Sequence, residues 1–409
     1  MSKLSSRAMP EGRTPHSARR TRASSRAPFL SSRAQRGICS SALLALSSGL
    51  AAQIPSSIEF RVPTPPTVVV NDSGGVLVYE LHVTNLTPAP IKLTRVDVLD
   101  GRGATLGSLA DSALLRAIAR PGLPPRAPEP ATIGAGLRAI VYCWVHVDAN
   151  RPPAQVLHRL ALARGAADSI RETLEGAAVP VAPRAVEIAP PFGGQWAALN
   201  GPSNVSGHRR LVLALNGADA SAQRFAIDYL KVDSAGHSYS GDRTKNSSYY
   251  AYGTEIHAVA DGIVVETKDS IPENVPGVLP PVSLVTVGGN HIVIDIGNQK
   301  FAFFAHVQPG SLRVRVGDHV KQGQVIALLG NSGNSTEPHL HFHVSDALAA
   351  GTTTLGSEGV PYAFSELKIV GHCAVTTAIV CTRAAPVTVR NGMPMQNQLV
   401  ELSGVAPRR

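Results

Sequence analysis

The chain has 409 residues, a length that accommodates two domains of ordinary size. Its formal net charge is +9, but residues 1–37 contain nine Lys or Arg and one acid, Glu11, so this segment carries +8 and the rest of the chain about +1. That remainder excludes the basic surface that a nucleic-acid-binding protein requires, so no nucleic-acid partner is expected. With 16% charged residues, 37 Gly and 31 Pro, the composition favours a mainly β protein with many short strands and turns.

Residues 1–52 are predicted to be a basic leader followed by a signal peptide. The run ICSSALLALSSGLAAQ, residues 38–53, combines an apolar middle with small residues at its end. It is too short to cross a bilayer, and its end favours cleavage near Ala51 or Ala52. We therefore expect an exported protein, periplasmic or extracellular, without a stable membrane span after cleavage.

Residues 53–177 are predicted to form an N-terminal β-sandwich accessory domain. In residues 76–100, apolar and more polar side chains alternate up to the turn sequence TPAP and again after it. This pattern predicts a hairpin of a half-exposed antiparallel sheet, and nothing in the region has the spacing of a catalytic site. Residues 178–203 are rich in Pro and Gly and are interpreted as a linker.

Residues 204–370 are predicted to form a compact antiparallel β-sheet domain, because short strand-like runs alternate with Gly, Asp and Asn turns. The Asn-Gly turn signal at 216–217 predicts that the segments on either side of it, GHRRLVLALNG and AQRFAIDYLKV, pair as antiparallel strands. In the hairpin that we expect, Leu215 faces Ala222. The register of such a hairpin decides which side chains come together at its open end.

Residues 371–409 are expected to be a C-terminal tail. This segment contains Cys373 and Cys381, close together in sequence. In an exported protein this pair is compatible with a disulfide, and equally with two buried free thiols.

Three histidines occupy alternate positions in the segment EPHLHFHVSD: His339, His341 and His343. Side chains two residues apart on a strand point to the same face, so a strand here would present the three imidazoles together. Histidine is the commonest metal ligand, and zinc is held by His nitrogen and carboxylate oxygen atoms. The spacing therefore indicates a metal or catalytic strand rather than a plain polar surface.

Five segments resemble, in their order along the chain, the lysostaphin-type (LytM-like) zinc endopeptidases that cut peptide cross-links in bacterial cell walls. They are FAIDY, YGTEIHAVADGIV, GNHIVIDIG, FFAHV and VRVGDHVKQGQVIALLGNSGNSTEPHLHFHV, within residues 204–346. The resemblance implies an antiparallel β-sheet metallopeptidase domain, a zinc cofactor and peptidoglycan peptides as substrate. It does not extend to the N-terminal region.

Carried over position by position, the resemblance implies that Asp228 and His341 are zinc ligands. It implies that His306, in FFAHV, and His339 orient or deprotonate the zinc-bound water and stabilise the tetrahedral oxyanion. A metal-bound hydroxide then attacks the amide carbonyl, and no covalent intermediate is needed. His343 lies one step beyond this pair, where we expect a hydrogen bond to a ligand or plain exposure.

The sequence departs from the family pattern at Arg224, where the family has a histidine four residues before the aspartate. Arginine has no lone pair for a cation, so it cannot bind zinc. His208 is the candidate replacement, because the hairpin register above places it opposite Tyr229, one residue from Asp228. The alternative is a catalytically degenerate domain that binds peptidoglycan or activates a partner cell-wall hydrolase.

Overall fold

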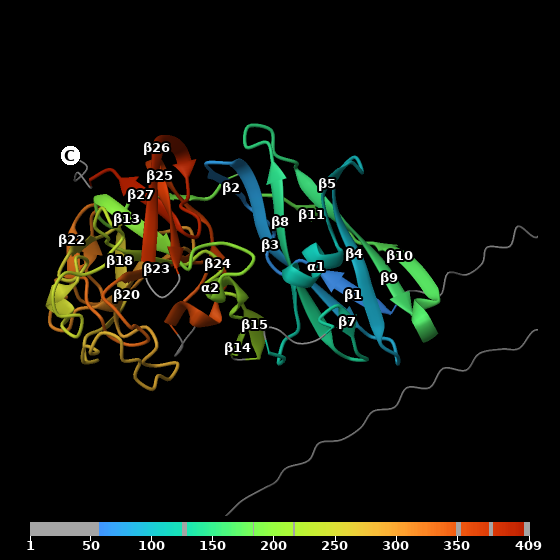
Figure 1. Ribbon diagram of the computed structural model, residues 1–409, viewed down its shortest axis with the longest axis horizontal. Helices are drawn as coiled ribbons and strands as arrows, with labels where there is room; N and C mark the ends of the chain where they lie inside the picture. The colour runs from blue at the N-terminus through green and yellow to red at the C-terminus, as the bar shows by residue number, and fades with distance from the viewer. Residues whose placement is uncertain are drawn as a thin grey trace, which may run out of the picture. The chain divides into compact units, whose positions relative to one another are not determined.

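The computed structural model describes residues 57–124, 129–182, 184–215, 217–348, 353–375 and 379–404. The predicted leader and signal peptide, residues 1–52, lie outside them. The described chain is mainly β, with antiparallel sheets, as predicted (Figure 1). Among the described helices, none is long and apolar enough to cross a membrane.

The first part of the chain contributes strands to two sheets. The elements are β1 (Ile58–Arg61), β2 (Val68–Asn71), β3 (Gly74–Asn85), β4 (Ile91–Asp100), β5 (Thr105–Ala110), α1 (Asp111–Ala117), β6 (Ile118–Ala119), β7 (Thr132–Ile133), β8 (Arg138–Val147), β9 (Gln155–Arg164), η1 (Ala166–Asp168), β10 (Ile170–Glu175) and β11 (Val179–Pro180). β3 pairs with β1, β2 and β8, whereas β4 pairs with β5, β7 and β9. Side chains from both sheets fill one buried cluster.

The predicted hairpin across TPAP is wrong, because β3 and β4 belong to different sheets. The alternation in β3 has another cause. Leu77 and Tyr79 pack into the cluster shared with β4 and β9, whereas Val76 and Val78 pack into the core of the second half of the chain. β3 is therefore buried on both faces, and residues 55–409 form one compact unit. A separate N-terminal sandwich domain is not confirmed.

The second part of the chain builds the sheet that carries the site. Its elements are β12 (Val186–Ile188), β13 (Gly194–Leu199), α2 (Gly207–Arg210), β14 (Leu213–Leu215), β15 (Ala218–Ala220), β16 (Ile227–Leu230), η2 (Asn246–Ser248), β17 (Glu255–His257), β18 (Gly262–Lys268), β19 (Asn290–Asp295), β20 (Phe301–Val307), β21 (His319–Val320), β22 (Val325–Leu328), β23 (Leu340–Ser345), η3 (Thr353–Gly356) and β24 (Gly359–Val360). Antiparallel pairing runs from β13 through β16, β23, β20 and β19 to β18. Ile292, Phe304 and Phe342 lie in its buried core.

The predicted pairing of GHRRLVLALNG with AQRFAIDYLKV is wrong. Leu215 pairs with Ala218 rather than Ala222, in a small hairpin of β14 and β15. Gly217 has a φ of +83°, which suits a tight turn. The chain then leaves this hairpin, since Phe225 and the residues of β16 are buried in the main core, where β16 pairs with β13 and β23.

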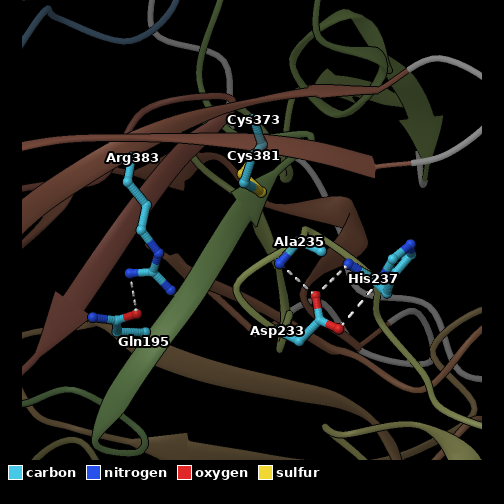
Figure 2. Close-up of a disulfide and its surroundings, with 7 residues drawn as sticks. All are labelled: Gln195, Asp233, Ala235, His237, Cys373, Cys381 and Arg383. Carbon is cyan, nitrogen blue, oxygen red and sulfur yellow. Dashed lines mark hydrogen bonds and ion pairs between the residues drawn. A yellow bond between two sulfur atoms is a disulfide. The ribbon is translucent and has the colours of Figure 1, made fainter.

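The described part of the predicted C-terminal tail is paired into the sheet. It completes β25 (Tyr362–Val375) and forms β26 (Ile379–Gly392) and β27 (Gln398–Leu402). β27 pairs with β13 and β25, and its apolar side chains are buried. Cys373 and Cys381 form a disulfide between β25 and β26, as Figure 2 shows beside the hydrogen bond from Arg383 to Gln195. Of the two interpretations of this pair, the structure has the disulfide.

Candidate metal centre

A cleft of about 980 Å³ is lined by residues of β16, β20 and β23. Its lining includes the five residues that the sequence predicts as site residues: His208, Asp228, His306, His339 and His341. The structure therefore brings together side chains from separate elements. They are His208 of α2, Asp228 of β16, His306 near the end of β20, His339 just before β23 and His341 of β23.

Backbone pairing places Asp228 and His341 side by side. They are directly opposed in the antiparallel ladder of β16 and β23, and His341 Nδ1 lies 2.9 Å from Asp228 Oδ1. On the other edge of β23, His341 opposes Ala305 of β20. Cross-strand neighbours are close in any antiparallel ladder, so this contact follows from the sheet itself.

His208 reaches the same place from α2, a single helical turn. Its Nδ1 lies 3.1 Å from the Asn200 carbonyl oxygen and donates to it, which leaves Nε2 with a free lone pair. That Nε2 lies 3.6 Å from Asp228 Oδ2. Asn200 Nδ2 also donates to the same oxygen, at 2.7 Å. The candidate ligand atoms of His208, Asp228 and His341 all lie within 4.8 Å of one another.

His306 and His339 form the other side of the centre, with ring centroids 4.7 Å apart. His306 Nδ1 donates to the Ser332 carbonyl at 2.7 Å, and His339 Nδ1 donates to the Glu337 carbonyl at 2.8 Å. His306 thus keeps Nε2 for the cleft, and His339 Nε2 lies 3.5 Å from Asp228 Oδ1. His306 has a φ of +65°, which a residue with a side chain rarely adopts and which functional sites favour.

The charges of the centre follow from burial and contact. Burial raises the pKa of the Asp228 carboxyl, but His208 and His339 outweigh it, so this pKa lies well below its usual value. Burial lowers the pKa of His208 to about 4 and holds that of His306 well below its ordinary range. For His339, burial acts in the same direction, but Asp228 outweighs it and raises the pKa. An ionised carboxylate and neutral imidazoles are the protonation states that a metal ion binds.

Arg224 is absent from this group of side chains. It is buried, and its guanidinium donates to Glu80, to the Gly359 carbonyl oxygen at 2.9 Å and to Glu358 Oε2 at 2.5 Å. The remaining donor set consists of two imidazoles and one carboxylate, and all three residues line the cleft. This set suits zinc, whose catalytic sites keep three protein ligands and one exchangeable position.

Two contacts were not predicted from the sequence. Asn200 lies in the segment interpreted as a linker, and Gln223 Nε2 lies 3.5 Å from His341 Nε2; neither has a local sequence signal. His343 is fully buried, with Nδ1 3.1 Å from His341 Nε2. Of the two expectations for His343, exposure is therefore wrong and a hydrogen bond to the candidate ligand is what the structure has.

Residues 248–352 match the model of Peptidase family M23. The chain contains a peptidase family M23 domain. This confirms the predicted resemblance to the lysostaphin-type enzymes. The match includes His306, His339 and His341 but begins after His208 and Asp228, so the roles of these two residues depend on geometry.

The chain spans about a fifth of the length of the curated relatives that it matches. Peptidoglycan DD-endopeptidase ShyA of Vibrio cholerae is 34% identical over 92 residues, which is 22% of this chain and 17% of ShyA. Glycyl-glycine endopeptidase ALE-1 of Staphylococcus capitis is 31% identical over 90 residues, 22% of this chain and 21% of ALE-1. Among solved structures, the catalytic domain of the M23 protein EnpA from Enterococcus faecalis is 24% identical, with a TM-score of 0.24, over 38% of this chain and 85% of that one.

Proposed function

We propose that the protein is an exported, zinc-dependent metalloendopeptidase that cleaves peptide bonds of bacterial peptidoglycan. The observation that carries the proposal is the convergence of His208, Asp228 and His341 beside the pair His306 and His339, in a chain with a match to peptidase family M23. The names of ShyA and ALE-1, both endopeptidases, support the substrate class. The predicted signal peptide supports export.

In this proposal, His208, Asp228 and His341 hold the zinc ion. When bound, zinc supplies a Lewis acid that polarises the scissile carbonyl and makes water nucleophilic near neutral pH. The protein orients this ligand set through Asn200, which accepts from His208 and donates to Asp228. Such contacts fix the direction of the ligand atoms and the tautomer of the imidazole.

His306 and His339 divide the proton transfers between them. His306 is buried and neutral, so its Nε2 accepts a proton from the attacking water. Asp228 raises the pKa of His339, and the Nε2–H of His339 donates a hydrogen bond to the developing oxyanion and then transfers its proton to the leaving amine. The hydrogen bonds from both Nδ1 atoms to backbone carbonyls keep the two Nε2 atoms directed at the cleft.

The cleft suits an extended peptide. Along one wall, Leu279, Leu284 and Val285, from the segment between β18 and β19, line the cleft and are about half exposed, at 54%, 46% and 63%. Apolar walls around a few convergent polar groups are typical of substrate sites. We infer that this wall contacts the peptide on one side of the scissile bond.

Arg224 supports one alternative, a degenerate domain that binds peptidoglycan or activates a partner hydrolase. It occupies the position of a usual ligand, and its side chain points to Glu80 and Glu358 instead of the centre. The geometry of His208 favours the enzyme over this alternative, because an imidazole from another element completes the donor set.

The test is to measure bound zinc and the release of muropeptides from purified cell walls. We expect about one zinc per chain, as a single catalytic site requires. His341→Ala should abolish both zinc binding and release, because it removes a ligand. The matched control is His319→Ala, since His319 is an exposed residue of β21, and it should change neither. A wild-type protein that binds no zinc and releases no muropeptides contradicts the proposal, and stimulation of a partner hydrolase by that metal-free protein supports the alternative.

A further inference from the structure

One buried carboxylate, Glu80 of β3, contacts two arginines. Its Oε1 accepts from Arg209 Nε at 2.9 Å, and its Oε2 accepts from Arg224 Nε. Glu80 is 2% exposed, Arg209 0% and Arg224 4%. Burial raises the pKa of Glu80, but the two guanidinium groups outweigh it and leave the pKa below its usual value, so the carboxylate is ionised.

Arg209 connects Glu80 to the turn that carries His208. It is the next residue of α2, and its Nη2 also donates to the backbone carbonyls of Tyr79, at 2.8 Å, and Cys143, at 2.9 Å. A further hydrogen bond goes to Asn204, within the segment that leads into α2. The Nε and Nη2 donors of this side chain thus fix a four-residue turn to β3 and β8, and no backbone ladder joins these strands to the turn.

Arg224 connects the same carboxylate to the segment that leads into β16 and Asp228. Its other donors reach Gly359 and Glu358. The two segments also contact each other, since Ser221 Oγ donates to the Arg209 carbonyl at 3.1 Å and the Arg224 N–H donates to the Ser221 carbonyl at 3.2 Å. Both segments that carry candidate ligands outside β23 therefore share Glu80.

We propose that Glu80 is a positioning residue of the zinc centre: it holds the His208 turn through Arg209 and the Asp228 segment through Arg224. The proposal rests on the proposed function, because it takes His208 and Asp228 to be zinc ligands. It assigns β3, far from the M23 domain in sequence, a part in metal binding. It also gives Arg224 a role: at the position of the usual ligand, it binds the carboxylate that holds the replacement ligand in place.

The chemistry of the contacts explains why the effect should reach the metal. His208 has one hydrogen bond of its own, from Nδ1 to Asn200, so the position of its Nε2 depends on where α2 lies. Loss of the Glu80 carboxylate leaves two buried guanidinium groups without their shared anion, and such groups move towards water or other acceptors. α2 then no longer fixes the imidazole, while the backbone ladder of β16 and β23 remains.

The experiment compares zinc affinity of the full chain and of Glu80→Gln by competition with a chelator at constant pH. We expect Glu80→Gln to lower the affinity by roughly 10–100-fold, the range for residues that orient ligands, with about one zinc still bound at saturation. The matched control is Asp219→Asn. Asp219 pairs with Arg138 of β8 at 2.6 Å and so also connects β8 to β15, but it does not contact the His208 turn. This control should retain wild-type affinity.

Two further measurements distinguish positioning from a general loss of stability. The visible spectrum of the cobalt-substituted protein should shift in Glu80→Gln towards that of His208→Ala, because the same ligand is displaced. Arg209→Lys keeps the positive charge but loses the fork that reaches Tyr79 and Cys143, and it should weaken zinc binding less. It provides the test if Glu80→Gln does not fold.

A folded Glu80→Gln or Arg209→Lys protein with wild-type zinc affinity and an unchanged cobalt spectrum overturns the proposal. An equal loss of zinc affinity in Asp219→Asn also overturns the proposal, because removal of any charged contact with β8 would then weaken zinc binding. Failure of the proposed function looks different, since the wild-type chain itself would bind no zinc.

Discussion

The two imidazoles proposed as zinc ligands, His341 and His208, are held in place by different means. His341 lies in β23, which has backbone ladders on both edges, to β16 and to β20. His208 lies in a single helical turn fixed by side-chain contacts to residues more than 60 positions away along the chain. The first position depends on local sequence and sheet geometry, and the second depends on tertiary structure.

The difference shows how a metal site can change a ligand without losing its geometry. Arg224 lies in the turn before β16, and its side chain contacts Glu80 and Glu358 rather than the centre. In the proposed site the replacement ligand comes from another element, and Arg224 contacts the same carboxylate, Glu80, as Arg209 of that element.

The largest effect that tests this comparison is expected from His208→Ala. Loss of a ligand should lower zinc affinity by more than the roughly 100-fold that orienting residues contribute at most. Muropeptide release should fall with the bound zinc. Bound zinc and muropeptide release are measured at fixed total zinc, with His237→Ala as the control. The side chain of His237 is 63% exposed, and among the contacts described it pairs only with nearby Asp233. Unchanged zinc binding in His208→Ala would show that the turn supplies no ligand.

A smaller effect is expected from Arg224→His, which restores the residue type of the family at its usual position. Glu80 and Glu358 lose a buried partner, so we expect a loss of about 3–5 kcal/mol in the free energy of unfolding. The measurement is chemical denaturation, with Arg313→His as control. Arg313 pairs with Glu255 where both are about half exposed, and its loss should cost at most about 1 kcal/mol.

The double variant His208→Ala, Arg224→His shows whether position 224 can still supply a ligand. We expect it to bind zinc no better than His208→Ala, because the contacts of residue 224 in this structure lie on the side of Glu80 and Gly359. Zinc binding restored to the wild-type level would mean that the usual ligand position is intact and that the comparison between strand and turn is wrong.

The sequence was sufficient for the parts of the molecule that local pattern determines. Alternating histidines predicted that one face of β23 lies in the site, the composition predicted the mainly β fold, and the order of the motifs predicted the resemblance to the lysostaphin-type enzymes. Pairing between distant segments was not predictable in the same way. The register that placed His208 near Asp228 was wrong, and the two residues meet because a helical turn, not a strand, approaches Asp228.

The same limit applies to β3 and to His343. Alternation in β3 was interpreted as one buried and one exposed face, but both faces are buried in different cores, which a single sequence does not distinguish. His343 was expected to be exposed or to bond a ligand, and in the structure it is buried, with Phe303 and His341 packed beside it.

The smallest effect concerns the support of the His208 turn at acid pH. His158 is 2% exposed, its Nε2 accepts from Tyr79 Oη at 2.8 Å, and burial lowers its pKa to about 4. Between pH 6.5 and 4 the unfolded chain binds a proton at His158 that the folded chain does not. Stability is therefore complete above pH 6.5 and falls towards pH 4, by roughly 3 kcal/mol from this residue.

His158→Gln should remove that part of the pH dependence while it keeps an acceptor for Tyr79, whose carbonyl binds Arg209. Denaturation at pH 7 and pH 4.5 measures the change, and His237→Gln, at an exposed side chain, should leave the wild-type dependence intact. Hydrogen exchange at pH 4.5 should show that His158→Gln protects residues 207–210 more than residues 340–345, because Arg209 bonds the turn directly to Glu80 and Tyr79 of β3. Equal protection of both segments would mean that the turn and the strand share one support, and that their different construction has no consequence for stability.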